Sequence, residues 1–285
     1  VYSVAFSPDA ERIAFSTYDT KKVVLWDVIS KEHNIHELSG HSELILSTAF
    51  SHDGSKIVSA SIDKTIKIWD TKSLKEIFTI NGHTGPVRTA YYSSDDKYIL
   101  SSSNDSTARL WNAKTHKEIR RFEGHEAIIQ SARFNSRNDK IVTSSNDGTV
   151  RVWDVKSGRL IQTLIDPSNK KIYYSDACFS PDGENVYASA HDGTIKKWKW
   201  ETGELNKVYY GHTSRAYSIS CTSDGTTLVS SGEKNIIIWN SETGDIIKKL
   251  NLHSTTIHGV DISTNDSLSV SGSPDGRVII WKDLQ

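Results

Sequence analysis

The sequence contains no methionine and only two cysteines among its 285 residues. Cys178 and Cys221 are too few for a disulfide framework, and we interpret both as small buried residues of a protein in a reducing compartment. An intracellular location, cytoplasmic or nuclear, is therefore expected. Because the chain begins at Val1 and has no methionine at all, we also expect it to be part of a longer protein.

Net charge is nearly absent as well. Lys and Arg number 34, Asp and Glu number 35, and the formal net charge is −1. This balance produces no general attraction to nucleic acid or to an anionic membrane, so neither is expected as a partner. No apolar run approaches the roughly 18 residues of a membrane helix, and no signal peptide is visible. These absences favour a soluble protein that binds other proteins or peptide segments, in an oligomeric state that the sequence leaves open.

Seven tryptophans recur at almost constant spacing, 41 to 45 residues apart. Each closes a segment in which apolar and polar residues alternate, such as KTIKIW or GTVRVW, and this alternation is typical of a half-buried strand. A polar turn precedes that segment, two further strands come earlier, and a fourth strand such as KEIFTI follows. Helical periodicity is absent. The tryptophans are Trp26, Trp69, Trp111, Trp153, Trp198, Trp239 and Trp281.

A repeated unit of four short antiparallel strands predicts a β-propeller, because each unit can bury its faces only against neighbouring units in a ring. The expected fold class is all-β, a single domain of seven four-stranded blades over residues 1–285. Only KDLQ follows Trp281, so the last blade is expected to lack its outer strand and to expose a bare edge. The expected blades are approximately residues 1–39, 40–81, 82–123, 124–167, 168–210, 211–251 and 252–285.

Two dipeptides recur in register with the tryptophans. Gly-His stands at residues 40–41, 82–83, 124–125 and 211–212, and Leu252-His253 takes its place in the last unit. Trp-Asp closes three units, at residues 26–27, 69–70 and 153–154. With these motifs the chain resembles the WD-repeat propellers over its whole length, and the resemblance implies the same fold.

Four units combine a His, a Ser or Thr, an Asp and the Trp at fixed offsets. A catalytic triad is needed once, in one cleft, whereas this set repeats around the ring, so we predict no catalytic residue and no enzyme. In WD-repeat proteins such a set resembles a structural hydrogen-bond tetrad that runs from Asp to His to hydroxyl to indole N–H. The expected tetrads are His41, Ser59, Asp63 and Trp69; His83, Ser101, Asp105 and Trp111; His125, Thr143, Asp147 and Trp153; and His253, Ser271, Asp275 and Trp281.

The other three units depart from this pattern. Unit five has Ala188 where the hydroxyl belongs, unit one has Phe15 there, and unit six is one residue short, with Glu233 near the position of the missing Asp. These three blades are expected to depend on apolar packing alone. The remaining histidines share no metal-ligand spacing and no Gly-rich phosphate loop precedes a helix, so neither a metal nor a cofactor is predicted.

In the family that the chain resembles, the commonest docking surface carries the starts of the inner strands and the turns before the Trp-bearing strands. Here these positions are rich in Tyr and include two Arg, but no Asp, Glu or Lys, a composition typical of interface cores. We therefore predict a Tyr-rich docking face. Its candidate partner-binding residues are Tyr2, Tyr18, Leu44, Leu46, Ile62, Arg88, Gln130, Tyr173, His191, Arg215, Tyr217 and His258.

Two functions are compatible with this face. The first is a non-catalytic interaction scaffold that docks partner segments within a larger protein or complex. The second is a recognition receptor for a phosphorylated or acidic peptide motif held by Arg88 and Arg215. Binding through the arginines would weaken strongly as salt is raised, which separates the two hypotheses.

Overall fold

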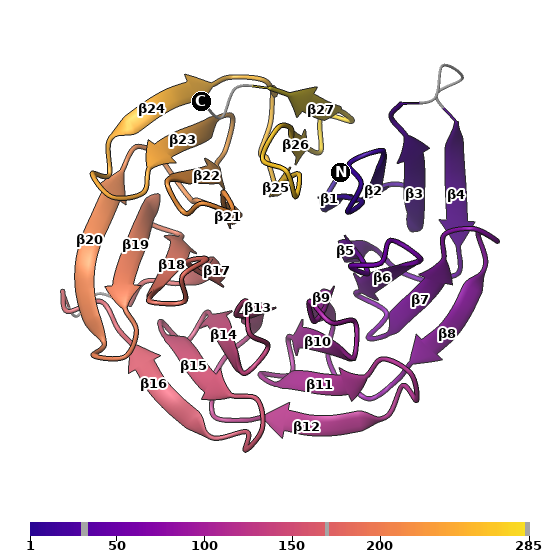
Figure 1. The fold of residues 1–285 in the computed structure, drawn as a ribbon, viewed down its shortest axis with the longest axis horizontal. Helices are drawn as coiled ribbons and strands as arrows, with labels where there is room; N and C mark the ends of the chain where they lie inside the picture. The colour runs from indigo at the N-terminus through magenta and orange to yellow at the C-terminus, as the bar shows by residue number, and fades with distance from the viewer. Residues whose placement is uncertain (30–33, 169–170, 283–285) are drawn as a thin grey trace.

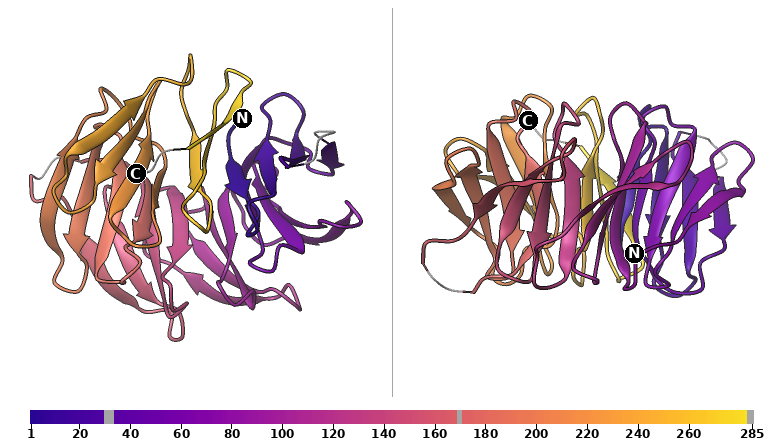
Figure 2. Two further views of the ribbon diagram at one scale, coloured as in Figure 1. Left: turned by 45° about the horizontal axis from the view of Figure 1, so that its top comes forward. Right: turned by 90° about the horizontal axis from the view of Figure 1, so that it is seen from below.

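The computed structural model describes residues 1–29, 34–168 and 171–282, and these form a ring of β-sheets around a central axis (Figure 1). Six sheets have four strands and the seventh has three. Seen from the side, the ring is a thick disc with the strands running across its thickness (Figure 2). The prediction of an all-β, seven-bladed propeller whose last blade has three strands is confirmed. No helix of the described residues is long and apolar enough to span a membrane.

Within each blade the strands are antiparallel and follow chain order from the central channel to the rim. Blade one comprises β1 (Val4–Phe6), β2 (Arg12–Ser16), β3 (Lys22–Asp27) and β4 (Ile35–Ser39). Blade two comprises β5 (Ile45–Phe50), β6 (Lys56–Ser61), β7 (Ile66–Asp70) and β8 (Glu76–Ile80). Blade three comprises β9 (Val87–Tyr92), β10 (Tyr98–Ser103), β11 (Ala108–Asn112) and β12 (Glu118–Phe122). Blade four comprises β13 (Ile129–Phe134), β14 (Lys140–Ser145), β15 (Val150–Asp154) and β16 (Leu160–Leu164).

The remaining three blades complete the ring. Blade five comprises β17 (Tyr174–Phe179), β18 (Asn185–Ala190), β19 (Thr194–Lys199) and β20 (Glu204–Tyr210). Blade six comprises β21 (Ile219–Cys221), β22 (Thr227–Ser231), β23 (Ile236–Asn240) and β24 (Ile246–Leu250). Blade seven comprises β25 (Gly259–Ile262), β26 (Ser269–Gly272) and β27 (Val278–Trp281).

Short polar turns join the first and second strands, and blade two shows how the sequence builds them. Ser51 Oγ and Ser55 N donate hydrogen bonds to Asp53 Oδ1, at 2.7 and 2.8 Å. Gly54 follows with a φ of 69°, a left-handed conformation that a residue without Cβ adopts at little cost. These local hydrogen bonds end the inner strand at a defined residue, and so they set which residues of that strand face the channel.

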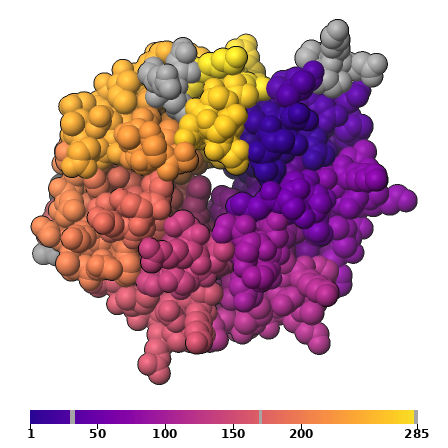
Figure 3. Space-filling view, in the orientation of Figure 1, coloured from indigo at the N-terminus to yellow at the C-terminus, as the bar shows by residue number. Residues whose placement is uncertain are grey.

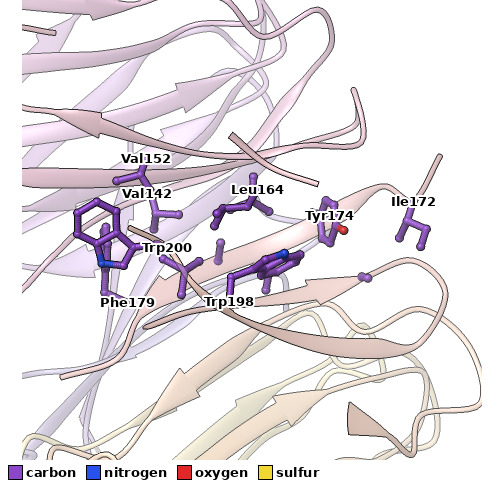
Figure 4. Packing of buried hydrophobic residues seen from close by; sticks show 13 residues of the cluster. Val142, Val152, Leu164, Ile172, Tyr174, Phe179, Trp198 and Trp200 are labelled. Carbon is purple, nitrogen blue, oxygen red and sulfur yellow. The ribbon is translucent and has the colours of Figure 1, made fainter. Parts of the chain in front are cut away.

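The hydrophobic core is divided into clusters that lie between adjacent blades. The cluster between blades four and five joins Val142, Val152 and Leu164 to Tyr174 and Trp198 (Figure 4). The Trp198 side chain is fully buried, and its ring centroid lies 5.8 Å from that of Tyr174 in an edge-to-face contact. Removing a large buried aromatic side chain costs roughly 3–5 kcal/mol of stability. Each recurring Trp is therefore an element of the packing between two blades.

A chain of hydrogen bonds fixes the buried Trp in blade two. Trp69 Nε1 donates to Ser59 Oγ at 2.8 Å, Ser59 Oγ lies 2.8 Å from His41 Nε2, and His41 Nδ1 lies 2.7 Å from Asp63 Oδ2. Because the hydroxyl accepts from the indole, its own proton is directed to His41 Nε2, and the imidazole carries its proton on Nδ1. The Ser is thus hydrogen-bonded on both sides inside the sheet.

Equivalent tetrads are present in blades three and four. The indole-to-hydroxyl distances are 2.8 Å at Trp111 and 2.9 Å at Trp153. Burial lowers the pKa of His83 and His125, against the opposing effect of their Asp partners. In blade seven His253 lies 2.9 Å from Ser271 Oγ and 3.0 Å from Asp275 Oδ2. The indole of Trp281, however, has no hydrogen-bond partner among the described residues, so the fourth expected tetrad lacks its last link.

Blade six contains a tetrad that the sequence analysis did not predict. His212 Nδ1 lies 2.8 Å from Asn235 Oδ1, His212 Nε2 lies 2.7 Å from Ser230 Oγ, and Trp239 Nε1 donates to the same hydroxyl at 2.8 Å. Asn235, not Glu233, takes the place of the Asp. The expectation that this blade depends on packing alone was wrong, because the one-residue deletion moves the acceptor to a different offset.

Blade five replaces the His with a buried cation, so here too the expectation of packing alone was wrong. Lys196 Nζ lies 3.3 Å from Asp166 Oδ2 and 3.3 Å from Asp192 Oδ2, and it donates to Thr194 Oγ1 at 2.6 Å. The Lys196 side chain is only 1 % exposed, so this ion-paired network lies inside the protein. The Trp198 indole has no hydrogen-bond partner among the described residues.

The last blade and the first blade are joined by hydrogen bonds between their inner strands and between the turns that follow these strands. Asp261 Oδ2 accepts a hydrogen bond from Phe6 N at 2.9 Å, and Thr264 Oγ1 donates to Pro8 O at 2.8 Å. At other blade junctions the side chain that accepts the hydrogen bond lies two positions earlier in its blade than Asp261 does. Between blades one and two, for example, Ser3 Oγ accepts a hydrogen bond from Thr48 N. Gly259 occupies that earlier position in blade seven and has no side chain to offer, so Asp261 serves instead.

The tetrads predict opposite effects for two substitutions at equivalent positions. Ser59→Ala leaves both the Trp69 indole and the His41 ring without a partner, and should lower the free energy of unfolding by about 1–3 kcal/mol. Ala188→Ser gives the unpartnered Trp198 indole an acceptor, and should raise it by up to about 1 kcal/mol. Chemical denaturation of the purified chain measures both changes.

Ser144→Ala is the matched control, because the Ser144 hydroxyl is buried and has no hydrogen-bond partner among the described residues. Its loss should leave the free energy of unfolding almost unchanged. An equal loss for Ser59→Ala and Ser144→Ala would show that the tetrad hydrogen bonds do not stabilise the blade.

Candidate docking site at the channel mouth

The inner strands surround a channel that opens at the centre of the ring (Figure 3). The channel contains a cavity of about 530 Å³. At one end each blade contributes one residue, the fourth before the last residue of its inner strand. These seven residues, which we call the channel mouth, all line the cavity: Tyr2, Leu46, Arg88, Gln130, Ser175, Tyr217 and His258.

Seven of the twelve candidate partner-binding residues line this cavity, namely Tyr2, Leu46, Arg88, Gln130, Arg215, Tyr217 and His258. The other five flank the mouth. Ile62 N donates a hydrogen bond to Leu44 O, and His191 N donates to Tyr173 O, both at 2.9 Å. Tyr173 and Tyr18 are 40 % and 52 % exposed, so their rings are available to a partner. Sequence analysis did not select Ser175, the remaining mouth residue.

Aromatic rings form a continuous stack on one side of the mouth, across blades one, seven and six. The ring centroids of Tyr18 and Tyr2 are 5.7 Å apart, and those of Tyr2 and His258 are 4.6 Å apart. His258 meets Tyr217 edge-on at 5.0 Å, and the Arg215 guanidinium lies 4.5 Å from the centroid of the Tyr217 ring. Such ring contacts hold the side chains in place before any partner arrives.

The opposite side of the mouth is polar. Arg88 Nε donates a hydrogen bond to Asn104 Oδ1 at 2.6 Å, and Gln130 Nε2 donates to Asn146 Oδ1 at 3.1 Å. In both blades the acceptor is the residue just before the turn Asp. Asn104 and Asn146 were not among the candidates, although they lie just before the turn Asp, as the candidates Tyr18, Ile62 and His191 do. Their hydrogen bonds hold the arginine and the glutamine, both of which line the cavity.

The two arginines of this face lack acidic partners. No carboxylate lies within ion-pair distance of Arg88 or Arg215 among the described residues, whereas Arg109, Arg133 and Arg151 each pair with an Asp. Burial lowers the pKa of both Arg88 and Arg215, and the positive charge of Arg215 lowers that of Arg88 further. Each Nε is held by a neutral acceptor, since Arg215 Nε donates to Ser175 Oγ at 3.1 Å. Arg88 in the mouth and Arg215 beside it are therefore two positive charges held in place without an ion-pair partner among the described residues.

The histidine of the stack is neutral at physiological pH. Burial and the nearby Arg215 guanidinium lower the pKa of His258 to about 4. A neutral imidazole can both donate and accept a hydrogen bond. His258 thus offers a partner a polar contact without adding a third positive charge.

Below the mouth, charged side chains that the sequence analysis missed line the channel. Arg133 Nε and Nη2 donate to the two carboxylate oxygens of Asp176, at 3.1 and 2.6 Å. The Arg133 guanidinium also lies 5.2 Å from the centroid of the Tyr91 ring. Asp261 lines the same cavity on blade seven. The available signal was a charged residue at inner-strand positions where other blades have uncharged ones, such as Ala5 and Ala49 in the position of Arg133 and Asp261.

The side chains around the channel mouth are suited to binding. The described residues contain no group of three or more His, Cys, Asp or Glu side chains that could hold a metal ion. The four sets of His, hydroxyl and Asp predicted from the sequence lie within the blades, where their hydroxyl groups are buried. What the mouth presents is a pre-formed aromatic surface, amide groups and two guanidinium groups.

Comparison with known proteins identifies the family. A family model described as "WD domain, G-beta repeat" matches residues 32–70, 74–112, 116–154, 158–199, 203–240 and 244–282. These six matches cover most of the chain. The chain therefore belongs to the WD-repeat family, which confirms the resemblance noted in its sequence.

Several relatives match over part of their length. The chain is 37 % identical to Ribosome assembly protein 4 of Saccharomyces cerevisiae over 71 residues, which is 25 % of the chain and 14 % of that protein. It is 30 % identical to COMPASS component SWD3 of the same yeast over 110 residues, 38 % of the chain and 35 % of that protein. It is 36 % identical to a Poly(A)+ RNA export protein of Schizosaccharomyces pombe over 74 residues, 26 % of the chain and 21 % of that protein. The matched segments thus span about a third or less of these relatives.

The contact between Arg215 and the aromatic stack predicts how His258 titrates. Arg215→Gln removes the positive charge that disfavours the imidazolium, so the pKa of His258 should rise from about 4 by roughly half a pH unit or more. Burial remains, so the value should stay below that of an exposed histidine. Titration of the histidine ring protons by NMR measures the change.

Arg159→Gln is the control, since Arg159 is exposed and lies on the turn between β15 and β16. It should leave the pKa of His258 unchanged. An unchanged pKa in Arg215→Gln as well would contradict the close approach of the guanidinium to the stack.

Proposed function

We propose that this chain is a non-catalytic protein-interaction scaffold that docks segments of partner proteins over the channel mouth, as part of a larger protein or complex. The observation that carries the proposal is the aromatic stack from Tyr18 to Tyr217, which lies at the open end of a cavity and includes no acidic residue. Rigid aromatic side chains and arginine supply most of the binding energy in many protein interfaces.

The relatives support this proposal by what their names describe. COMPASS component SWD3 is named as a component of an assembly, and Ribosome assembly protein 4 is named for an assembly process. We propose by analogy that the present chain also acts by holding proteins together. We further propose that it acts in the cytoplasm or nucleus, and its two cysteines, which are unpaired, are compatible with a reducing compartment.

The docking proposal predicts that the mouth, and not the rim, determines partner binding. A Leu46→Ala, Tyr217→Ala double variant should weaken the binding of partner proteins by about tenfold or more, because it removes apolar contact area on two sides of the mouth. Quantitative affinity pull-down, with circular dichroism to verify folding, measures the effect.

A Tyr210→Ala, Ile246→Ala variant is the matched control, because both side chains are exposed on outer strands, at 75 % and 44 %. It should retain all the partners of the wild type. The docking assignment fails if the two variants lose the same partners or if neither loses any.

A second candidate function is recognition of a phosphorylated or acidic motif, and the uncompensated charges of Arg88 and Arg215 favour it. A phosphate or carboxylate group placed between the two guanidinium groups would relieve their mutual repulsion and accept hydrogen bonds from their terminal N–H groups. In this case the affinity of a bound partner should fall steeply as salt is raised.

An Arg88→Gln, Arg215→Gln variant tests the second candidate. Its affinity for captured partners should be lower than that of the wild type, and should depend much less on salt between about 50 mM and 500 mM, a range in which the screening length shortens severalfold. Arg159→Gln should keep the salt dependence of the wild type. An identical salt dependence in the double variant would rule out the arginines as the anion site.

A further inference from the structure

Asp261 is an acidic side chain of the channel without a cationic partner. Its carboxylate lines the same cavity as Arg88, Arg133 and Arg215, and it accepts a hydrogen bond from Phe6 N at 2.9 Å. It forms no ion pair among the described residues. Asp176, the other acidic residue that lines the cavity, is bound on both oxygens by Arg133. The charge of Asp261 is therefore the one acidic charge of the described channel lining that is left unpaired.

This carboxylate determines the net charge that an anion meets in the channel. Three arginines and two aspartates line the cavity, so the net charge of its lining is +1 while Asp261 is ionised. Protonation of Asp261 would raise this net charge to +2. Charges that line a narrow cavity with low-dielectric walls act on a ligand more strongly than the same charges on an open surface.

The surroundings of Asp261 place its ionisation near neutral pH. Burial raises its pKa to about 6, although the backbone N–H groups of Phe6 and Ile262 and the charge of Arg133 oppose this effect. Four strands pack against β25, namely β1, β21, β22 and β26. Their one titratable side chain is Cys221, whose pKa burial raises, so it stays neutral. Across the channel the titratable neighbour is Tyr91, whose pKa burial also raises.

We propose that Asp261 regulates anion binding in the channel, weakening it when the carboxylate is charged and permitting tighter binding when the carboxylate is protonated. The proposal rests on the second candidate function, in which Arg88 and Arg215 hold the phosphate or carboxylate group of a partner segment. It adds that this recognition is stronger in mildly acidic conditions. A bound anion must, in return, favour the protonated form of Asp261.

Inorganic sulfate tests the proposal, because it stays a dianion over the whole range and so any pH effect arises from the protein. Sulfate binding is measured by isothermal titration calorimetry at constant ionic strength, at about pH 7.5 and about pH 5 on either side of the ionisation of Asp261. Wild-type affinity should rise by about two- to tenfold at the lower pH, because protonation removes one negative charge from the channel lining. The Asp261→Asn variant keeps a side-chain oxygen that can accept the hydrogen bond from Phe6 N, and it should bind sulfate tightly at both pH values.

Two controls separate the effect of Asp261 from general electrostatics. Asp245→Asn removes the same charge outside the channel lining and should behave as the wild type at both pH values. Arg88→Gln, Arg215→Gln should abolish sulfate binding. Carbon-13 NMR of the carboxyl groups measures the pKa of Asp261 directly in the wild type, without any substitution. Saturating sulfate should raise this pKa.

The outcomes distinguish this proposal from the one on which it rests. Sulfate binding that requires the two arginines but is the same in wild type and Asp261→Asn overturns the role of Asp261 and leaves anion recognition standing. An Asp261 pKa that sulfate does not change also overturns it. If the wild type binds no sulfate at either pH, both proposals fail, whereas the docking of partner proteins is tested separately by the pull-down.

Discussion

Every blade of this ring depends on its neighbours, because a four-stranded sheet with two apolar faces cannot bury both faces by itself. The clusters that join successive blades meet this requirement, with a large aromatic residue such as Trp153 or Trp198 in most of them. Where a tetrad is present, its hydrogen bonds fix the orientation of the indole. Where it is altered, as in blade five, a buried ion-paired network at Lys196 occupies the same region. The packing between blades is therefore kept while its polar support varies.

The same constraint explains why a docking site arises at the channel mouth. Inner-strand residues that pack between blades are buried and mostly apolar, as at Ala132 and Ile219. The channel-mouth residue of each blade borders the channel instead, so packing does not determine its identity. Seven such positions meet around one opening, and this chain has placed Tyr, Arg, His, Leu, Gln and Ser there. The regular blades thus carry a varied set of side chains around one opening, and a varied set of side chains can select a particular partner.

The sequence predicted the repeat architecture well because the information is local and redundant. Seven Trp residues at nearly equal spacing and the alternation before them define blade, strand and turn without any long-range knowledge. The errors fall where one repeat departs from the others. A single deletion concealed the role of Asn235, and no offset rule relates Lys196 to Asp166, which precedes it by 30 residues in an irregular connection. The channel residues Arg133, Asp176 and Asp261 were missed because each is a charged residue at a position that is uncharged in most of the other blades, so no repeated pattern marks it.

The sequence by itself determined the fold class, the number of blades and most of the structurally equivalent positions, since these follow from periodicity. Only the tertiary structure decided which of these residues interact. The stack of Tyr2 on His258 joins residues near opposite ends of the chain, and the Arg133–Asp176 ion pair crosses between two blades. The ion pair depends on the docking of adjacent blades, and the Tyr2–His258 contact depends on closure of the ring, which brings the last blade against the first. Closure is a property of all the blades together, and no repeat taken alone contains it.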